Sequence, residues 1–315
     1  MKKMLICGAN GFLGKNAVEK FMGKYQIRAV DLNLPSNPQP GVEWIQADLT
    51  KKEDVQKVMK DVDVVLQYAA VSTGIRDAIE RPYLHVTDNV VMNSFLMREA
   101  FEQNVEHFIF PSCTVMYNAA PNPVVEDDFN GVLDENSAYF GGGGMKVYLE
   151  NVCKFYSKLG KTKFTVIRQS NLYGPHDKFQ LEKSHVFAAS ITKVMIAQEG
   201  GEVVVWGDGS EKKDFIYVGD LMNFIELALN QQQSQFELVN LGGGEAVSIK
   251  NLVETIVDAS KKNVKISYDL TKPTRKVSLE INSDKAKTLF NWQPKTDIKS
   301  GIGNVITWYR QNILK

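Results

Sequence analysis

Residues 3–14 read KMLICGANGFLG, an apolar run that leads directly into a turn with three glycines. The apolar run has the length of a buried strand, and Gly8, Gly11 and Gly14 stand where the chain would turn into a helix. Glycines at this place let backbone N–H groups and a helix N-terminus approach a pyrophosphate. The stretch therefore predicts the first turn of a dinucleotide-binding βαβ unit.

Apolar runs continue to alternate with helical periodicity through the first half of the chain. This alternation is typical of βαβ units and a parallel sheet. We predict an α/β fold with a Rossmann-type, doubly wound parallel sheet. The expected strands cover residues 3–7, 27–31, 42–47, 62–69, 107–112 and 164–169, and the expected helices cover 13–22, 52–60, 86–103 and 146–159.

An acidic residue follows the second expected strand. Asp31 stands where a carboxylate would accept hydrogen bonds from the adenosine ribose and repel the 2′-phosphate of NADP. The predicted cofactor is therefore NAD(H). Asp48, after the third strand, fits either a contact to the adenine or the N-cap of the next helix.

The alternation of apolar runs with helical periodicity becomes less regular after Gly174. A smaller lobe for the substrate is expected to begin there. We predict an NAD-binding Rossmann lobe over residues 1–172, to which residues 214–241 return. The C-terminal, substrate-binding lobe would comprise residues 173–213 and 242–315.

The composition excludes several kinds of partner. Lys+Arg and Asp+Glu number 37 each, so no overall charge attracts nucleic acid or an anionic membrane. Cys7, Cys113 and Cys153 are few and widely spaced, which argues against disulfides and structural zinc and fits a reducing cytoplasm. No apolar run is long enough to span a bilayer. We expect a cytoplasmic protein with no metal site.

Further motifs run almost from end to end of the chain: YAA at 68–70, FIFPSCTVMY at 108–117, NLYGPHD at 171–177, SHV at 184–186, VWG at 205–207 and DFIYV at 214–218. With the glycine turn they resemble the extended short-chain dehydrogenase/reductase family of NAD-dependent nucleotide-sugar epimerases and dehydratases. The last four motifs are especially similar to GDP-fucose synthases. The resemblance implies a GDP-linked sugar as substrate, and a homodimer or homotetramer formed through two helices of the Rossmann lobe.

The resemblance and the residue chemistry together predict two sets of contacts. The cofactor contacts are Gly8, Asn10, Gly11, Phe12, Leu13, Gly14, Asp31, Asp48, Leu49, Tyr68, Ala69, Ala70 and Lys146. The substrate contacts are Ser72, Thr73, Asn171, His185, Val186, Lys193, Val205, Trp206, Lys213 and Arg275.

Several of these predicted substrate contacts can also be explained without a bound substrate. Lys193, Lys213 and Arg275 could neutralise a diphosphate, but each alone is also typical of a solvated surface charge. Trp206 could cover a base or sugar and is equally compatible with the core. His185 resembles an acid that faces the sugar, and the alternative is a hydrogen-bonded histidine at a helix start.

The sequence departs from the family at the catalytic centre. The family uses a Tyr-x-x-x-Lys pair, in which tyrosinate takes the hydroxyl proton and lysine lowers the tyrosine pKa. Lys146 fits this pattern, but Gly142 stands four residues before it. Tyr139 could substitute only if the glycines at 141–144 are not helical, because a regular helix places it about 10 Å from Lys146 along the axis.

The serine position of the family is altered as well. Cys113 occupies it, with Thr114 adjacent. A neutral thiol is a weak donor, so Cys113 is at least as well explained by buried packing. Thr114 could supply the hydroxyl if the alignment shifts by one residue. The predicted catalytic residues are Lys146, Cys113, Thr114, Tyr139 and His185.

Three functions follow from these patterns. The first is an NAD-dependent oxidoreductase acting at C4 of a GDP-sugar. The missing tyrosine resembles a branch that includes GDP-mannoheptose 4-dehydrogenases of bacterial surface-polysaccharide synthesis. The second is a 4-epimerase or a GDP-fucose-synthase-like epimerase or 4-keto reductase. The third is a regulatory protein that binds NAD and a nucleotide sugar without catalysis.

Overall fold

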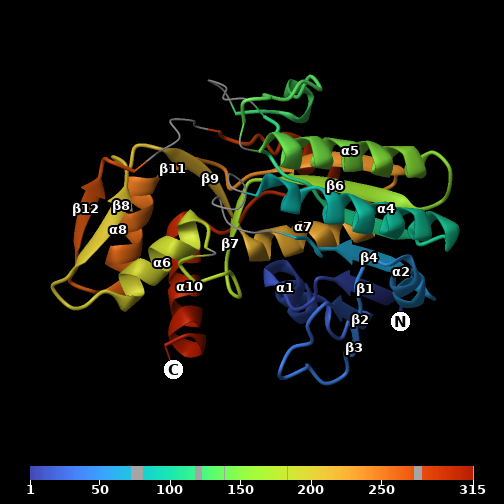
Figure 1. Cartoon of the computed structure of the whole chain (residues 1–315), viewed down its shortest axis with the longest axis horizontal. Coiled ribbons are helices and arrows are strands. Elements are labelled where there is room, and N and C mark those ends of the chain that lie inside the picture. Colours follow the sequence, from blue (N-terminus) through green and yellow to red (C-terminus); the bar gives the residue numbers. More distant parts are fainter. Residues whose placement is uncertain (72–80, 118–122, 138, 183, 273–278, 315) are drawn as a thin grey trace.

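The larger lobe is a seven-stranded parallel sheet with helices on both faces, as the sequence predicted (Figure 1). The computed structural model describes residues 1–71, 81–117, 123–137, 139–182, 184–272 and 279–314. The strand order is β10-β6-β5-β4-β1-β2-β3. The strands are β1 (Lys3–Cys7), β2 (Gln26–Asp31), β3 (Glu43–Gln46), β4 (Val64–Gln67), β5 (His107–Pro111), β6 (Lys163–Gln169) and β10 (Phe236–Leu241).

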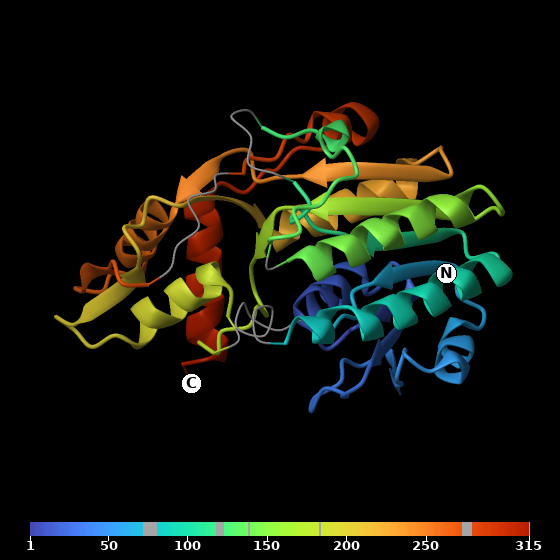
Figure 2. The same ribbon diagram turned by 45° about the horizontal axis from the view of Figure 1, so that its top comes forward.

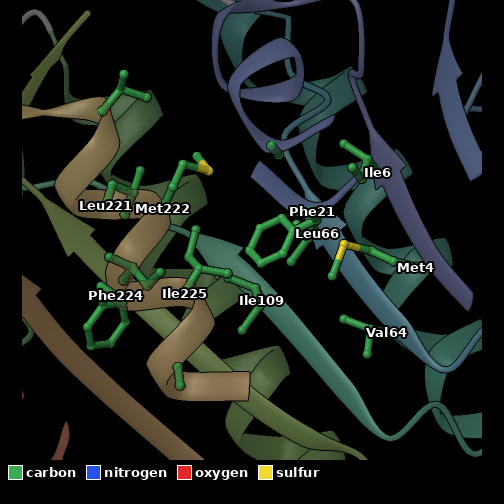
Figure 3. Close-up of a cluster of buried hydrophobic side chains, with 14 of the residues drawn as sticks. Met4, Ile6, Phe21, Val64, Leu66, Ile109, Leu221, Met222, Phe224 and Ile225 are labelled. Atoms are coloured by element: carbon green, nitrogen blue, oxygen red, sulfur yellow. The ribbon is translucent and has the colours of Figure 1, made fainter. Parts of the chain in front are cut away.

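The side chains of each strand alternate between two hydrophobic clusters. Met4 and Ile6 of β1 face α1 (Phe12–Phe21) and α7 (Val218–Gln231), as Figure 3 shows for residues of both helices. Leu5 and Cys7 enter the cluster on the opposite face, with α2 (Lys52–Met59), α4 (Thr87–Glu102) and α5 (Phe140–Ser157). Burial on both faces explains why these strands are continuously apolar.

The smaller lobe lies beside the carboxyl ends of the Rossmann strands (Figures 1 and 2). Its two sheets have the strand orders β11-β9-β7 and β12-β8. The strands are β7 (Asn171–Tyr173), β8 (Glu202–Trp206), β9 (Lys212–Tyr217), β11 (Ala246–Ser248) and β12 (Lys265–Asp269). The helices α6 (Val186–Ile196), α8 (Ile249–Ser260) and α10 (Ile298–Asn312) share one hydrophobic cluster with these strands.

The chain crosses between the lobes more than once. α7 and β10, both within the range expected to return to the Rossmann lobe, pack on α1 and pair with β6. β9, from the same range, belongs instead to the smaller lobe. α9 (Asp284–Phe290) also differs from the predicted boundaries, because Ala286, Phe290 and Trp292 enter the cluster beneath α7.

The start of α5 differs most from the expected helices. The helix begins at Phe140, six residues before the predicted start, and includes all four glycines. Short one-turn helices cover Pro82–His85 and Glu126–Asp128. Across the described residues, no helix is long and apolar enough to cross a membrane.

Candidate active site

A cavity of about 720 Å³ lies at the carboxyl ends of the Rossmann strands, with residues of the smaller lobe on its other side. Open α/β sheets bind their ligands at this edge, and the volume suits a small-molecule site. Many predicted site residues line it: Gly8, Gly11, Phe12, Leu13, Asp31, Asp48, Leu49, Tyr68, Ala69, Ala70, Cys113, Thr114, Lys146, Asn171, His185 and Val186.

Other predicted residues are not part of the wall of this cavity. Among the described ones, Asn10, Gly14, Tyr139, Lys193, Val205, Trp206 and Lys213 do not line it. Ser72, Thr73 and Arg275 lie outside the described residues.

Backbone crowding explains the glycines of the first turn. A Cβ atom on Gly14 would lie 2.2 Å from the carbonyl oxygen of Gly8, and one on Gly8 would lie 2.7 Å from the backbone nitrogen of Ala69. Gly8 also has φ +69°, which favours glycine. Gly11, the N-cap of α1, provides no side-chain hydrogen bond to the helix. The first N–H groups of α1 are therefore left to bind an anion in the cavity.

The Asp31 carboxylate is fixed by backbone donors. The N–H of Asn10 donates to Oδ2 at 3.0 Å, and the N–H of Asn33 donates to Oδ1 at 3.1 Å. The Asn10 side chain donates to the carbonyl of Asn33 at 3.0 Å and so stabilises the segment that follows β2. Each carboxylate oxygen has a further lone pair for a ribose hydroxyl.

Asp48 forms a turn before α2. Its Oδ1 accepts hydrogen bonds from the N–H and the hydroxyl of Thr50, at 3.1 and 2.7 Å. These bonds lower the pKa of Asp48. The N-cap of α2 is Lys51, so Asp48 lines the cavity without capping the helix.

Tyr68 adds a buried polar atom to the cavity wall. Its hydroxyl has no hydrogen-bond partner among the described residues, and burial raises its pKa, so the group stays a donor. An unpartnered donor at this place fits a ligand with phosphate or ribose oxygens. The glycine turn, Asp31 and Tyr68 therefore suit a dinucleotide.

Lys146 lies at the other end of the cavity. Its Nζ donates to the carbonyl of Pro111 at 2.7 Å and lies 4.7 Å from the centre of the Phe110 ring. Burial lowers the pKa of Lys146. Burial also raises the pKa of the nearby Cys113 thiol, although Lys146 opposes the shift. Cys113 is therefore a neutral thiol, and the hydroxyl of the adjacent Thr114, which also lines the cavity, is the stronger donor.

The helical start of α5 removes the condition under which Tyr139 could replace the missing phenol. Tyr139 is the N-cap of α5, seven residues before Lys146, which corresponds to about 10 Å along a helix axis. Gly142 lies one turn before Lys146, and a Cβ atom there would meet nothing within 4 Å. The place of the family's phenol is thus open.

His185 and Asp177 bring two titratable groups to the same cavity. His185 is the N-cap of α6 and makes no side-chain capping bond. Burial lowers its pKa, and so do the positive charges of Lys178 and Lys213. Burial raises the pKa of Asp177 to about 6. Asp177 is therefore suited to exchange a proton close to neutral pH, and His185 is a neutral imidazole there.

The described residues among the predicted base and diphosphate contacts lie on α6, β8 and β9 of the smaller lobe. Trp206 is 56% exposed, which excludes a core position. The ammonium groups of Lys193 and Lys272 each lie 5.7 Å from its ring centre. The side chain of Val205 is buried in the cluster of the smaller lobe. Lys213 pairs with Glu211 at 2.8 Å.

Comparison with known proteins identifies the family. The sequence profile of the NAD dependent epimerase/dehydratase family matches residues 4–242. The chain belongs to this family. It is therefore an NAD-dependent protein, and the predicted cofactor and family resemblance are both confirmed.

Relatives within the epimerase/dehydratase family cover nearly the whole chain. A putative UDP-glucose 4-epimerase of Methanocaldococcus jannaschii is 28% identical over 98% of this chain and 99% of its own length. GDP-L-fucose synthase 1 of Arabidopsis thaliana is 28% identical over 99% of this chain and 94% of its own. UDP-glucose 4-epimerase of Thermotoga maritima, a solved structure, matches with TM-score 0.84 at 22% identity over 99% of both chains. The solved structure shows the fold, and the profile match shows the family.

Some residues that line the cavity were not predicted from the sequence, among them Gln169, Asp177 and Lys178. Asp177 closes the NLYGPHD motif, so a signal was present. Gln169 is the last residue of the buried strand β6, and its role depends on the end of the neighbouring strand β5. Across the part of the chain that the structure describes, no group of three His, Cys, Asp or Glu residues could hold a metal ion.

Proposed function

We propose that this protein is an NAD-dependent oxidoreductase that acts at C4 of a GDP-linked sugar, a hexose or a heptose, in the synthesis of bacterial surface-polysaccharide precursors. The observation that carries the proposal is that Lys146, Thr114 and His185 line the same cavity as the dinucleotide turn. The bound dinucleotide supplies a hydride acceptor or donor there. The residues of this chain then have only to bind the sugar and move one proton.

Each of these residues has a distinct role in the proposal. Lys146, held against the carbonyl of Pro111, would bind the nicotinamide ribose and stabilise charge on the reacting oxygen. Thr114 would donate or accept at that oxygen. His185 is a neutral imidazole at neutral pH, because its pKa is lowered, so it is suited to accept the proton.

The choice of a guanine nucleotide rests on the motifs similar to GDP-fucose synthases and on Trp206. An exposed indole with Lys193 and Lys272 beside it suits a flat base and a diphosphate. Relatives named for UDP-sugars make UDP the natural competitor. Thermal melts test this choice: GDP should protect the fold more than UDP at equal concentration. Equal protection by both would contradict it.

The alternative function is a nucleotide-sugar epimerase or a 4-keto reductase of the GDP-fucose-synthase type. The names of the relatives favour it. Epimerisation at C3 and C5 needs a second acid or base beside His185. Burial keeps Cys113 protonated, so Asp177, with a pKa of about 6, is the candidate that the same cavity offers. A regulatory protein without catalysis is the third candidate, favoured by the absent phenol.

One experiment separates these functions. The purified protein is incubated with NAD⁺ and a panel of GDP- and UDP-sugars, while NADH absorbance is followed and the sugars are separated by chromatography. Net NADH with a 4-keto product supports the oxidoreductase. A new epimer without net NADH supports the epimerase. Loss of added NADH with a 4-keto sugar supports the reductase, and no change in any arm supports the regulatory protein.

We further propose a cytoplasmic homodimer or homotetramer assembled through α4 and α5. α5 presents Tyr148 and Phe155 to solvent, 50% and 57% exposed. Aromatic side chains of this kind are typical of interfaces. Phe155→Asp should shift the protein to a smaller species in analytical ultracentrifugation, whereas Val204→Asp on β8 should not.

A further inference from the structure

Gln169, the last residue of β6, lines the inner end of the cavity. Its Nε2 donates to the carbonyl oxygen of Ser112 at 2.7 Å. A carbonyl can only accept, so the amide nitrogen has to face Ser112. This fixes the orientation of the whole amide group and turns Oε1 away from Ser112.

The Oε1 atom of Gln169 has no hydrogen-bond donor among the described residues, although it is buried. A buried acceptor without a partner is costly, and such groups are generally satisfied by water or by a ligand. Gln169 forms part of the cavity wall, so a bound molecule with an N–H or O–H group is the natural partner.

The order of the strands indicates which end of the dinucleotide comes near Gln169. Asp31 and Asp48 follow β2 and β3, and the glycine turn follows β1. Gln169 lies at the end of β6, beyond β4 and β5 in the sheet. A dinucleotide with its adenosine at Asp31 and its pyrophosphate at the glycine turn extends toward β5 and β6 with its nicotinamide. The ribose hydroxyls of that end are assigned to Lys146, and the donor on the nicotinamide ring itself is the carboxamide –NH₂.

We infer that Oε1 of Gln169 accepts a hydrogen bond from the carboxamide of the nicotinamide and so fixes the orientation of the ring. Gln169 is then a positioning residue that joins the cofactor to Ser112, immediately before Cys113 and Thr114. The inference concerns the dinucleotide site and is independent of the sugar proposed above.

The test uses a cofactor analogue that lacks only this donor. In reduced 3-acetylpyridine adenine dinucleotide a methyl group replaces the –NH₂. Affinities for NADH and for the analogue are measured by fluorescence titration with the wild type, Gln169→Met and Gln46→Met. Gln46 is the matched control, because its Nε2 also donates to a backbone carbonyl, that of Leu32 at 2.9 Å, near the adenosine end.

The wild type should bind NADH about tenfold more tightly than the analogue, as expected for one buried hydrogen bond. Gln169→Met should remove this preference, and Gln46→Met should retain it. Loss of the Ser112 contact alone would weaken both ligands equally, so an unchanged preference in Gln169→Met overturns the inference. The absence of any preference in the wild type also overturns it, and this result needs no variant. If the wild type bound neither ligand, the dinucleotide site itself would be refuted.

Discussion

The chain has two glycine-rich segments beside one cavity, and they differ in what the glycines are needed for. In the first turn, a Cβ atom on Gly14 would lie 2.2 Å from a backbone oxygen. At the start of α5, a Cβ atom on Gly142 would meet nothing within 4 Å. Gly143 and Gly144 would only come into ordinary contact with Leu133, at 3.4 and 3.5 Å.

This difference separates two uses of glycine. The first turn needs its glycines to fold and to bring the backbone near a pyrophosphate. Packing does not explain Gly142, which costs helix stability at the place where the family has its phenol. The dinucleotide end of the cavity therefore follows the family's rules, while the catalytic end departs from them.

The largest effect is expected at the catalytic end, for Lys146→Met. Loss of this ammonium should slow single-turnover hydride transfer by about 10² to 10⁴, the range for a general acid or base. The assay uses a GDP-sugar that the wild type turns over. Tyr139→Phe should change the rate much less, because a helical start of α5 keeps residue 139 a turn too far away.

Both variants must melt as folded proteins and still bind GDP for this comparison to count. A large loss in Tyr139→Phe with Lys146→Met nearly silent would make Tyr139 the base. Full rates in both would show that the proton moves by a route without Lys146.

The next largest effect is expected for Gly14→Ala at the dinucleotide end. The added methyl group collides with backbone atoms of Gly8 and Ala9, which cannot move without opening the turn. NADH affinity should fall about hundredfold, or about 2.7 kcal/mol. Gly303→Ala in α10 is the matched control, because its Cβ atom would meet nothing within 4 Å and should leave NADH binding unchanged.

The sequence predicted the Rossmann sheet well because its strands are buried on both faces and alternate with helices along the chain. β1 matches its prediction residue for residue, and β2 differs by one residue. The start of α5 could not be predicted, since four glycines disfavour a helix. Packing of α5 against α4 and the short helix Pro82–His85, both distant in sequence, accompanies the helical conformation there.

The site could be predicted only where a motif fixes a backbone conformation. The glycine turn and Asp31 are of this kind. Gln169 could not be found, because its importance depends on a carbonyl at the end of another strand. Trp206 could not be assigned either, since exposure on a two-stranded sheet does not follow from its neighbours in sequence.

Two carboxylates that line the cavity, Asp177 and Asp48, provide a test with a smaller expected effect. Burial raises the pKa of Asp177 to about 6 from an ordinary value of 3.8, so the folded protein binds this proton more tightly than the unfolded chain. The contribution of Asp177 to stability therefore falls as pH rises from about 4 to about 6 and stays low above it. Asp177→Asn should stabilise the protein by about 1–2 kcal/mol at neutral pH and much less near pH 4.

Urea unfolding at both pH values measures this difference. Asp48→Asn should instead destabilise the protein. Hydrogen bonds from Thr50 lower the pKa of Asp48, so its charged form stabilises the fold at pH values above the pKa of the unfolded chain. Equal stabilisation by Asp177→Asn at both pH values would indicate that the Asp177 charge is not buried.

The smallest effect, Gly142→Ala, tests the comparison most directly, because it is the substitution made at Gly14 repeated in the glycine segment at the start of α5. Alanine at residue 142 fits the open space and lowers the entropy of the unfolded chain. Since residue 142 lies in the first turn of α5, the free energy of unfolding should rise by about 0.5 kcal/mol, at the low end of the glycine-to-alanine range. NADH affinity should not change. Calorimetric melting and NADH titration measure the two quantities on one sample. A destabilised Gly142→Ala would mean that the open space is filled in the native protein, and the two glycine segments would then share a steric cause.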